Sequence, residues 1–93
     1  MLLIEFDTAK CERNIRERGL SFDKAGEFEF ETAFVNTDER KQYGETRYSA
    51  IGRLAGSLHV LVFTLRGDVM RVISLRRANA RERMRYEQAT TPT

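Results

Sequence analysis

The sequence predicts a single α+β domain, residues 1–93, in which two N-terminal helices precede a mostly antiparallel sheet and one helix follows it. The 93 residues are 41% hydrophobic and 32% charged, which suits one modest core. Capping residues flank two helical stretches near the N-terminus and one near the C-terminus. Between them lie apolar, often alternating segments joined by short turns, the pattern of an antiparallel meander.

The first elements are expected to be a strand and a helix. Residues 2–6 (LLIEF) have the composition of a strand. Asp7 can cap a helix over about residues 8–18. Within this helix Cys11 and Ile15 are four residues apart, so we expect both to pack inward.

A second, short helix is expected after Gly19, a residue that suits the left-handed position at the end of a helix. Ser21 can cap the stretch 22–30 (FDKAGEFEF), although this stretch fits one helical face imperfectly and Gly26 weakens it. Its aromatic side chains are expected to join the core: Phe22, Phe28 and Phe30.

Strand patterns dominate the middle of the chain. The expected strands are residues 33–36, 46–54, 57–65 and 69–75. The stretch 57–65 (SLHVLVFTL) is apolar on both faces, so it should be a central strand that is covered on both sides. Tight turns on either side of it make the last three strands an antiparallel meander.

The last helix is expected to begin at Ala80. Asn79 can cap it, and Glu82 occupies the position that reaches back in a capping box. Ala80 and Met84 mark a thin apolar stripe, and the tail 89–93 is expected to fray. Three basic residues spaced by four are expected to share another face: Arg77, Arg81 and Arg85.

Several classes of protein and site are excluded by composition. No apolar run approaches the length of a membrane span, and MLLIEF is too short for a signal peptide, so we expect a cytoplasmic protein with no membrane contact. One cysteine (Cys11) and one histidine cannot build a zinc site, and no glycine-rich phosphate loop is present, so no metal or cofactor is expected. The histidine, His59, is expected to be a packed or half-exposed residue of the central strand.

Charge divides the chain into two unequal halves. Residues 1–45 hold 7 Lys/Arg and 11 Asp/Glu, whereas residues 46–93 hold 9 Arg and 3 Asp/Glu. Arginine is always charged and binds phosphate in two-point contacts. On charge alone, an ordinary arginine-rich surface and an anion-binding surface explain this pattern equally well.

Arginines also mark the predicted sheet. Strict alternation along residues 69–76 places Arg71 on one face and Arg76 on the other. Arg66 ends the preceding strand, and Arg47 begins the meander. We expect Arg66 and Arg76 to project from one end of the sheet toward a shared phosphate. Such a surface can bind RNA, although each single arginine could instead pair with a carboxylate across strands.

The order of motifs resembles the BrnT-type toxins of bacterial type II toxin–antitoxin modules, a branch of the RelE-like ribonuclease toxins. The matching motifs are IEFD with Lys10 and Asn14 after it, RGLSF, IGRLAGSLHVLVFTLRGD and RVISLRRANARERMRYE. Together they cover about residues 2–88, and the last block is the most specific. The chain departs from the family pattern at Arg18, where many members carry histidine.

The resemblance implies a RelE-like fold and an endoribonuclease that blocks translation until a BrnA-like antitoxin sequesters it. Operator DNA would be bound only through the antitoxin. The family's important arginines map onto Arg66 and Arg76, which are the candidate catalytic residues. The candidate phosphate contacts are Lys10, Arg47, Arg71 and Arg77.

The expected chemistry is metal-free attack by the neighbouring 2′-hydroxyl. Arginine stays protonated, so its role would be electrostatic clamping of the phosphate. Glu45 or Glu82 are candidate bases, and Tyr86 is a candidate proton donor. The alternative is a basic module that binds nucleic acid or protein and cleaves nothing.

Overall fold

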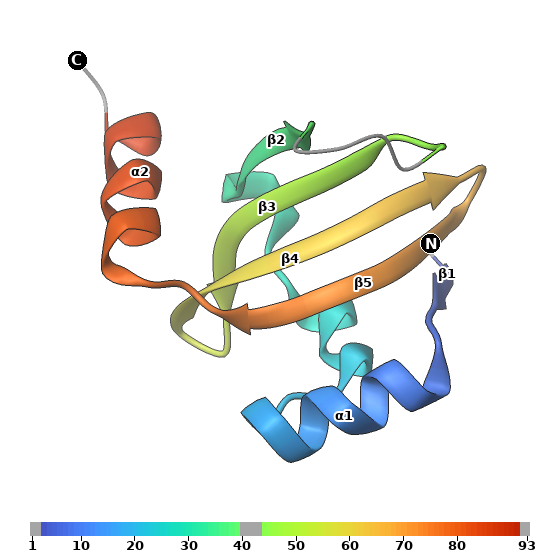
Figure 1. Ribbon diagram of the computed structural model, residues 1–93. Helices are drawn as coiled ribbons and strands as arrows, with labels where there is room; N and C mark the ends of the chain where they lie inside the picture. Colours follow the sequence, from blue (N-terminus) through green and yellow to red (C-terminus); the bar gives the residue numbers. More distant parts are fainter. Residues whose placement is uncertain (1–2, 40–43, 92–93) are drawn as a thin grey trace.

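A computed structural model describes residues 3–39 and 44–91 of the chain. A five-stranded sheet, in the order β1-β5-β4-β3-β2, carries α1 on one face and α2 on the other (Figure 1). The elements are β1 (Leu3–Glu5), α1 (Thr8–Arg18), the 3₁₀ helices η1 (Phe22–Glu27) and η2 (Phe30–Thr32), β2 (Phe34–Asp38), β3 (Arg47–Leu54), β4 (Ser57–Arg66), β5 (Val69–Arg77) and α2 (Ala80–Thr90). The predicted α+β class is confirmed.

The capping predictions for α1 and α2 are confirmed. Asp7 accepts a hydrogen bond from the Lys10 backbone N–H at 3.0 Å, and Gly19 ends α1 with φ 69°. Asn79 and Glu82 form the full capping box, with bonds of 2.8 Å and 2.9 Å. These motifs are local, so the residues that make them lie within one helical turn of each other.

The second N-terminal helix is a pair of 3₁₀ helices and not an α-helix, so that prediction is only partly right. Ser21 does cap η1, through a bond from the Asp23 N–H. The buried residues of this segment are Phe22, Ala25 and Phe28, which recur every third position. A 3₁₀ helix has three residues per turn, so it presents all three on one edge. The edge packs closely: a Cβ at Gly52 of β3 would lie 2.7 Å from Phe28 Cζ.

The inward face of α1 differs from the prediction at one position. Cys11 is buried, but Ile15 is 46% exposed. Asn14 is buried in its place, and its Nδ2 donates to the Leu20 carbonyl at 2.8 Å and to the Leu75 carbonyl at 2.9 Å. The side chain therefore ties α1 both to the turn that follows it and to β5.

Replacing Asn14 with alanine should destabilise the fold by about 2 kcal/mol, because one buried carbonyl and one partly buried carbonyl lose their donor. For a domain of this size that corresponds to a melting temperature lower by roughly 10 °C. The solvent-facing control is Ile15→Ala. Thermal melts in which both variants shift equally would contradict the role given to Asn14.

The sheet confirms β4 as the central strand and adds one irregularity. The register pairs Val62 with Ser74 but Phe63 with Val72, so Ile73 is an extra residue that forms a β-bulge. The bulge reverses the alternation that the sequence predicted for β5. Arg71 consequently lies on the same face as Ser74 and Arg76, and the prediction that Arg71 and Arg76 face opposite ways is wrong.

The packing face of α2 also differs from the prediction. Met84 is 60% exposed, whereas Tyr86 is buried with Ile51 and Val60 in a cluster between α2 and the sheet. The helix continues to Thr90, into the tail that was expected to fray. Among the described residues, no helix is long and apolar enough to cross a membrane.

Candidate functional site

The face of the sheet that carries α2 is covered by the helix at one end only (Figure 1). Val60 packs beneath α2 and pairs with Arg76 on β5, so Arg76 points to this face. Every second residue of β4 after Val60 points to the same face, namely Val62, Thr64 and Arg66. Thr64 pairs with Arg71, so Arg71 also points to this face. We call the uncovered part the open face. It carries four of the arginines that the sequence singled out: Arg47, Arg66, Arg71 and Arg76.

Arg66 and Arg76 lie at opposite ends of this face, contrary to the prediction. Arg66 pairs with Val69 beside the turn, while Arg76 pairs with Val60. Val60 and Arg66 are six residue steps apart along β4, which is about 20 Å. In an antiparallel hairpin the end of the first strand meets the start of the second, so the two arginines cannot reach one phosphate.

At the α2 end, Arg76 makes a two-point ion pair with Glu82. Its Nη1 and Nη2 each lie 2.7 Å from a Glu82 carboxylate oxygen. The Asn79 backbone N–H donates to the same carboxylate, so the helix cap and the ion pair share one side chain. Glu82 is only 16% exposed, and the hydrogen bonds from Arg76 and then from Asn79 lower its pKa. Glu82 is therefore a weak base while this pair is intact.

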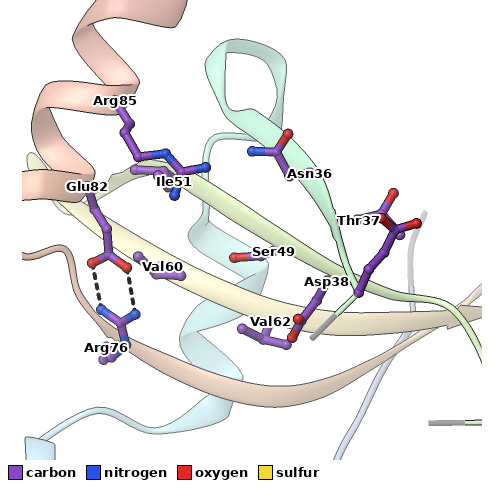
Figure 2. Close-up of a pocket in the computed structure, with 11 residues that line it drawn as sticks. Asn36, Thr37, Asp38, Ser49, Ile51, Val60, Val62, Arg76, Glu82 and Arg85 are labelled. Atoms are coloured by element: carbon purple, nitrogen blue, oxygen red, sulfur yellow. Dashed lines mark hydrogen bonds and ion pairs between the residues drawn. The ribbon is translucent and has the colours of Figure 1, made fainter. Parts of the chain in front are cut away.

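A pocket of about 260 Å³ lies beside this pair (Figure 2). Arg76 and Glu82 form one side, and Arg85 reaches over it from α2. Asn36 and Asp38 face them from β2. The pocket thus combines guanidinium groups, which can hold a phosphate, with carboxylates, which can accept a proton.

The far end of the open face holds a second group of ion pairs. Arg66 makes a two-point contact with Glu45, at 3.1 Å and 3.2 Å. Glu5 lies 2.6 Å from Arg71 and 3.9 Å from Arg66, which confirms that both arginines share this face. The contact with Arg66 lowers the pKa of Glu45, and the same contact raises the pKa of Arg66. The sequence left open whether single arginines pair with carboxylates. At this end of the open face Arg66 and Arg71 do so.

Three predicted site residues lie elsewhere. Lys10 is on α1, on the other side of the sheet, where it lines a shallow pocket with Arg13. Arg77 pairs with His59, whose side chain also points to the α1 face. Tyr86 is buried in the α2 core cluster and does not line the pocket beside Arg76.

The sequence did not point to three residues of the pocket: Asn36, Asp38 and Ser49. Asn36 pairs with Ser49 across β2 and β3, and the sheet carries both toward α2. No local motif marks them, because only the register between distant strands brings them together.

The comparison with known protein families decides the affiliation. Residues 6–82 match the model of the family described as the ribonuclease toxin BrnT of a type II toxin–antitoxin system. The chain belongs to the BrnT toxin family. No curated protein matches the chain at a significant level. Membership in the BrnT family identifies a ribonuclease toxin, which implies RNA as the substrate and an antitoxin as the partner.

Proposed function

We propose that this BrnT toxin is a metal-independent endoribonuclease that inhibits translation and that a BrnA-like antitoxin neutralises. The observation that carries the proposal is the open face. Its register aligns four arginines along one surface, and a pocket with both guanidinium and carboxylate groups lies at one end. A single RNA strand can follow the arginines from Arg66 to Arg76, with several phosphates in contact.

In the proposed reaction the phosphate that is attacked contacts Arg76. Its guanidinium stabilises the charge that develops on the phosphate oxygens. A bound phosphate competes with Glu82 for this guanidinium. When Glu82 loses that partner, its pKa rises toward the ordinary value and it becomes a better base.

The proposed reaction needs no metal ion. The 2′-oxygen attacks phosphorus and transfers its proton to Glu82, while the bond from phosphorus to the 5′-oxygen breaks. The leaving 5′-oxygen takes a proton from water. The products are a 2′,3′-cyclic phosphate and a 5′-hydroxyl end.

The arginines of the open face that lie away from Arg76 should increase the affinity for RNA and should not change the rate of cleavage. Replacing Arg47, Arg66 and Arg71 together with glutamine removes up to three phosphate contacts, so the salt dependence of RNA binding should weaken by about 2 units of slope. The control removes three charges elsewhere, at Arg16, Arg81 and Arg83. An equal loss of slope in both triple variants would show that net charge, and not the open face, binds RNA.

Inducible expression in a bacterium tests the function as a whole. Growth arrest should coincide with RNA cleavage, and co-expression of a BrnA-like antitoxin should relieve both. Purified protein should cleave RNA in the presence of a chelator. Loss of cleavage on chelation, with recovery on adding a divalent ion, would contradict the metal-free reaction. Growth arrest with intact RNA would favour the binding-module alternative.

A further inference from the structure

A second pocket, of about 240 Å³, lies on the α1 side of the sheet. It is formed where the end of α1 and η1 meet the turn between β3 and β4 and the end of β5. Its basic side chains come from three of these elements: Arg18, Lys24 and Arg77. Leu20 and Leu54 form an apolar part of the pocket wall. Arg77, which faces away from the open face, therefore lines this pocket.

The charges in this pocket are largely uncompensated. Three cationic groups face one carboxylate, that of Glu27, which gives a balance of about +2. Glu27 pairs with Lys24 at 3.4 Å. Within residues 3–39 and 44–91, no carboxylate lies within ion-pair distance of Arg18 or Arg77. Two guanidinium groups are therefore available to an anion.

His59 supplies a buried polar group in the same pocket. Its side chain is 4% exposed, and Nδ1 lies 2.9 Å from the Ser57 carbonyl oxygen. A carbonyl can only accept, so Nδ1 carries the proton. The other ring nitrogen, Nε2, has no hydrogen-bond partner among the described residues. Nε2 is not one of the fully enclosed polar atoms that lack a partner in the described part of the chain, so it is accessible from the pocket and can accept a hydrogen bond from a ligand.

We infer that this pocket binds a phosphate monoester, as carried by a 5′-nucleotide or by the 5′-end of an RNA strand. The dianion of a phosphate monoester matches the charge of the pocket better than the single charge of a phosphodiester does. Arg18 and Arg77 hold the phosphate oxygens in two-point contacts. Nε2 of His59 accepts a hydrogen bond from a hydroxyl of the attached sugar. The site is separate from the open face and does not depend on the proposed cleavage reaction.

The chain contains a single histidine, so the imidazole signals of His59 in a proton NMR spectrum report on this pocket alone. Titration of the full chain with 5′-AMP should shift these signals in a saturable way, whereas adenosine should not. Arg77→Gln and, separately, Arg18→Gln should each weaken 5′-AMP binding about tenfold. The matched control is Arg53→Gln, an exposed arginine on the opposite face of β3, which should bind 5′-AMP like the parent.

Two uncleavable 2′-O-methyl oligonucleotides, with and without a 5′-phosphate, separate the sources of the phosphate. A shift with the phosphorylated strand only identifies the RNA end as the ligand, and a shift with 5′-AMP but neither strand identifies a free nucleotide. The inference is overturned if 5′-AMP leaves His59 unchanged, if adenosine acts equally, or if Arg53→Gln weakens binding as much as Arg77→Gln. None of these readouts requires cleavage, so they remain informative if the proposed function fails.

Discussion

Replacing Arg76 with alanine should lower the rate of RNA cleavage at saturating RNA by about 10²-fold or more, because the transition state loses a two-point donor to the phosphate. Arg76→Lys should restore only part of the rate, since an ammonium group cannot make the two-point contact. Single-turnover cleavage of a defined oligonucleotide measures both variants. The same substitution also leaves Glu82 without its ion pair, so we expect a cost in stability of about 1 kcal/mol.

The control for Arg76 is Arg83→Ala. Arg83 lies on α2, does not line the pocket and donates to the Ala78 carbonyl at 3.0 Å. Its replacement should leave the rate nearly unchanged. Thermal melts must accompany the rates. If Arg76→Ala folds and cleaves like the parent, the reacting phosphate is not at Arg76; if it unfolds, the arginine is structural.

Replacing Glu82 with glutamine should lower cleavage by about 10²-fold, the lower end of the range for a lost general base. Glutamine has nearly the same shape, and its side-chain oxygen can still accept from Asn79, so the helix cap should survive. The parent's rate at saturating RNA should fall as pH is lowered and Glu82 becomes protonated. Glu82→Gln should lack this component. If the variant keeps the parent's rate and pH profile, the base lies elsewhere, with Asp38 across the pocket the next residue to replace.

Stability gives a second, independent readout on Glu82. Its pKa in the folded chain is lowered below the ordinary value of 4.5, so the ionised carboxylate stabilises the fold above that pH. The contribution is lost as pH falls through the lowered pKa. Melting temperatures of Glu82→Gln should therefore change less than those of the parent between neutral and strongly acid pH. Equal changes would indicate that the Arg76–Glu82 pair does not contribute to stability in solution.

Local motifs were predictable from the sequence because the interacting atoms are close along the chain. As expected, α1 begins after Asp7 and ends at Gly19, and α2 begins with the capping box of Asn79 and Glu82. The spacing of apolar residues predicted the buried face of α1 less well, because hydrogen bonds of a polar side chain also decide which residues lie inside. Ile15 is exposed because the neighbouring Asn14 bonds to two carbonyls beneath the helix.

The arrangement of the site residues could not be predicted from local sequence patterns, because it depends on how distant strands pair. One extra residue at the bulge, Ile73, moves Arg71 to the face of Arg76, and nothing in the alternation of residues 69–76 marks it. The pairing of strands also separates Arg66 from Arg76, although both are strand ends. The sequence did identify Glu82 as a capping residue and as a candidate base, but not that one carboxylate serves both the cap and Arg76.

The most direct test of the proposed function is to observe which arginine side chains contact RNA. Nε–Hε signals can be followed by ¹⁵N NMR while an uncleavable 2′-O-methyl RNA with a 5′-hydroxyl end is added to the full chain. The open face predicts shifts for Arg66, Arg71 and Arg76, with Arg16 and Arg83 unchanged. Shifts confined to arginines of α1, with Arg76 and Arg66 unaffected, would contradict an RNA site on the open face.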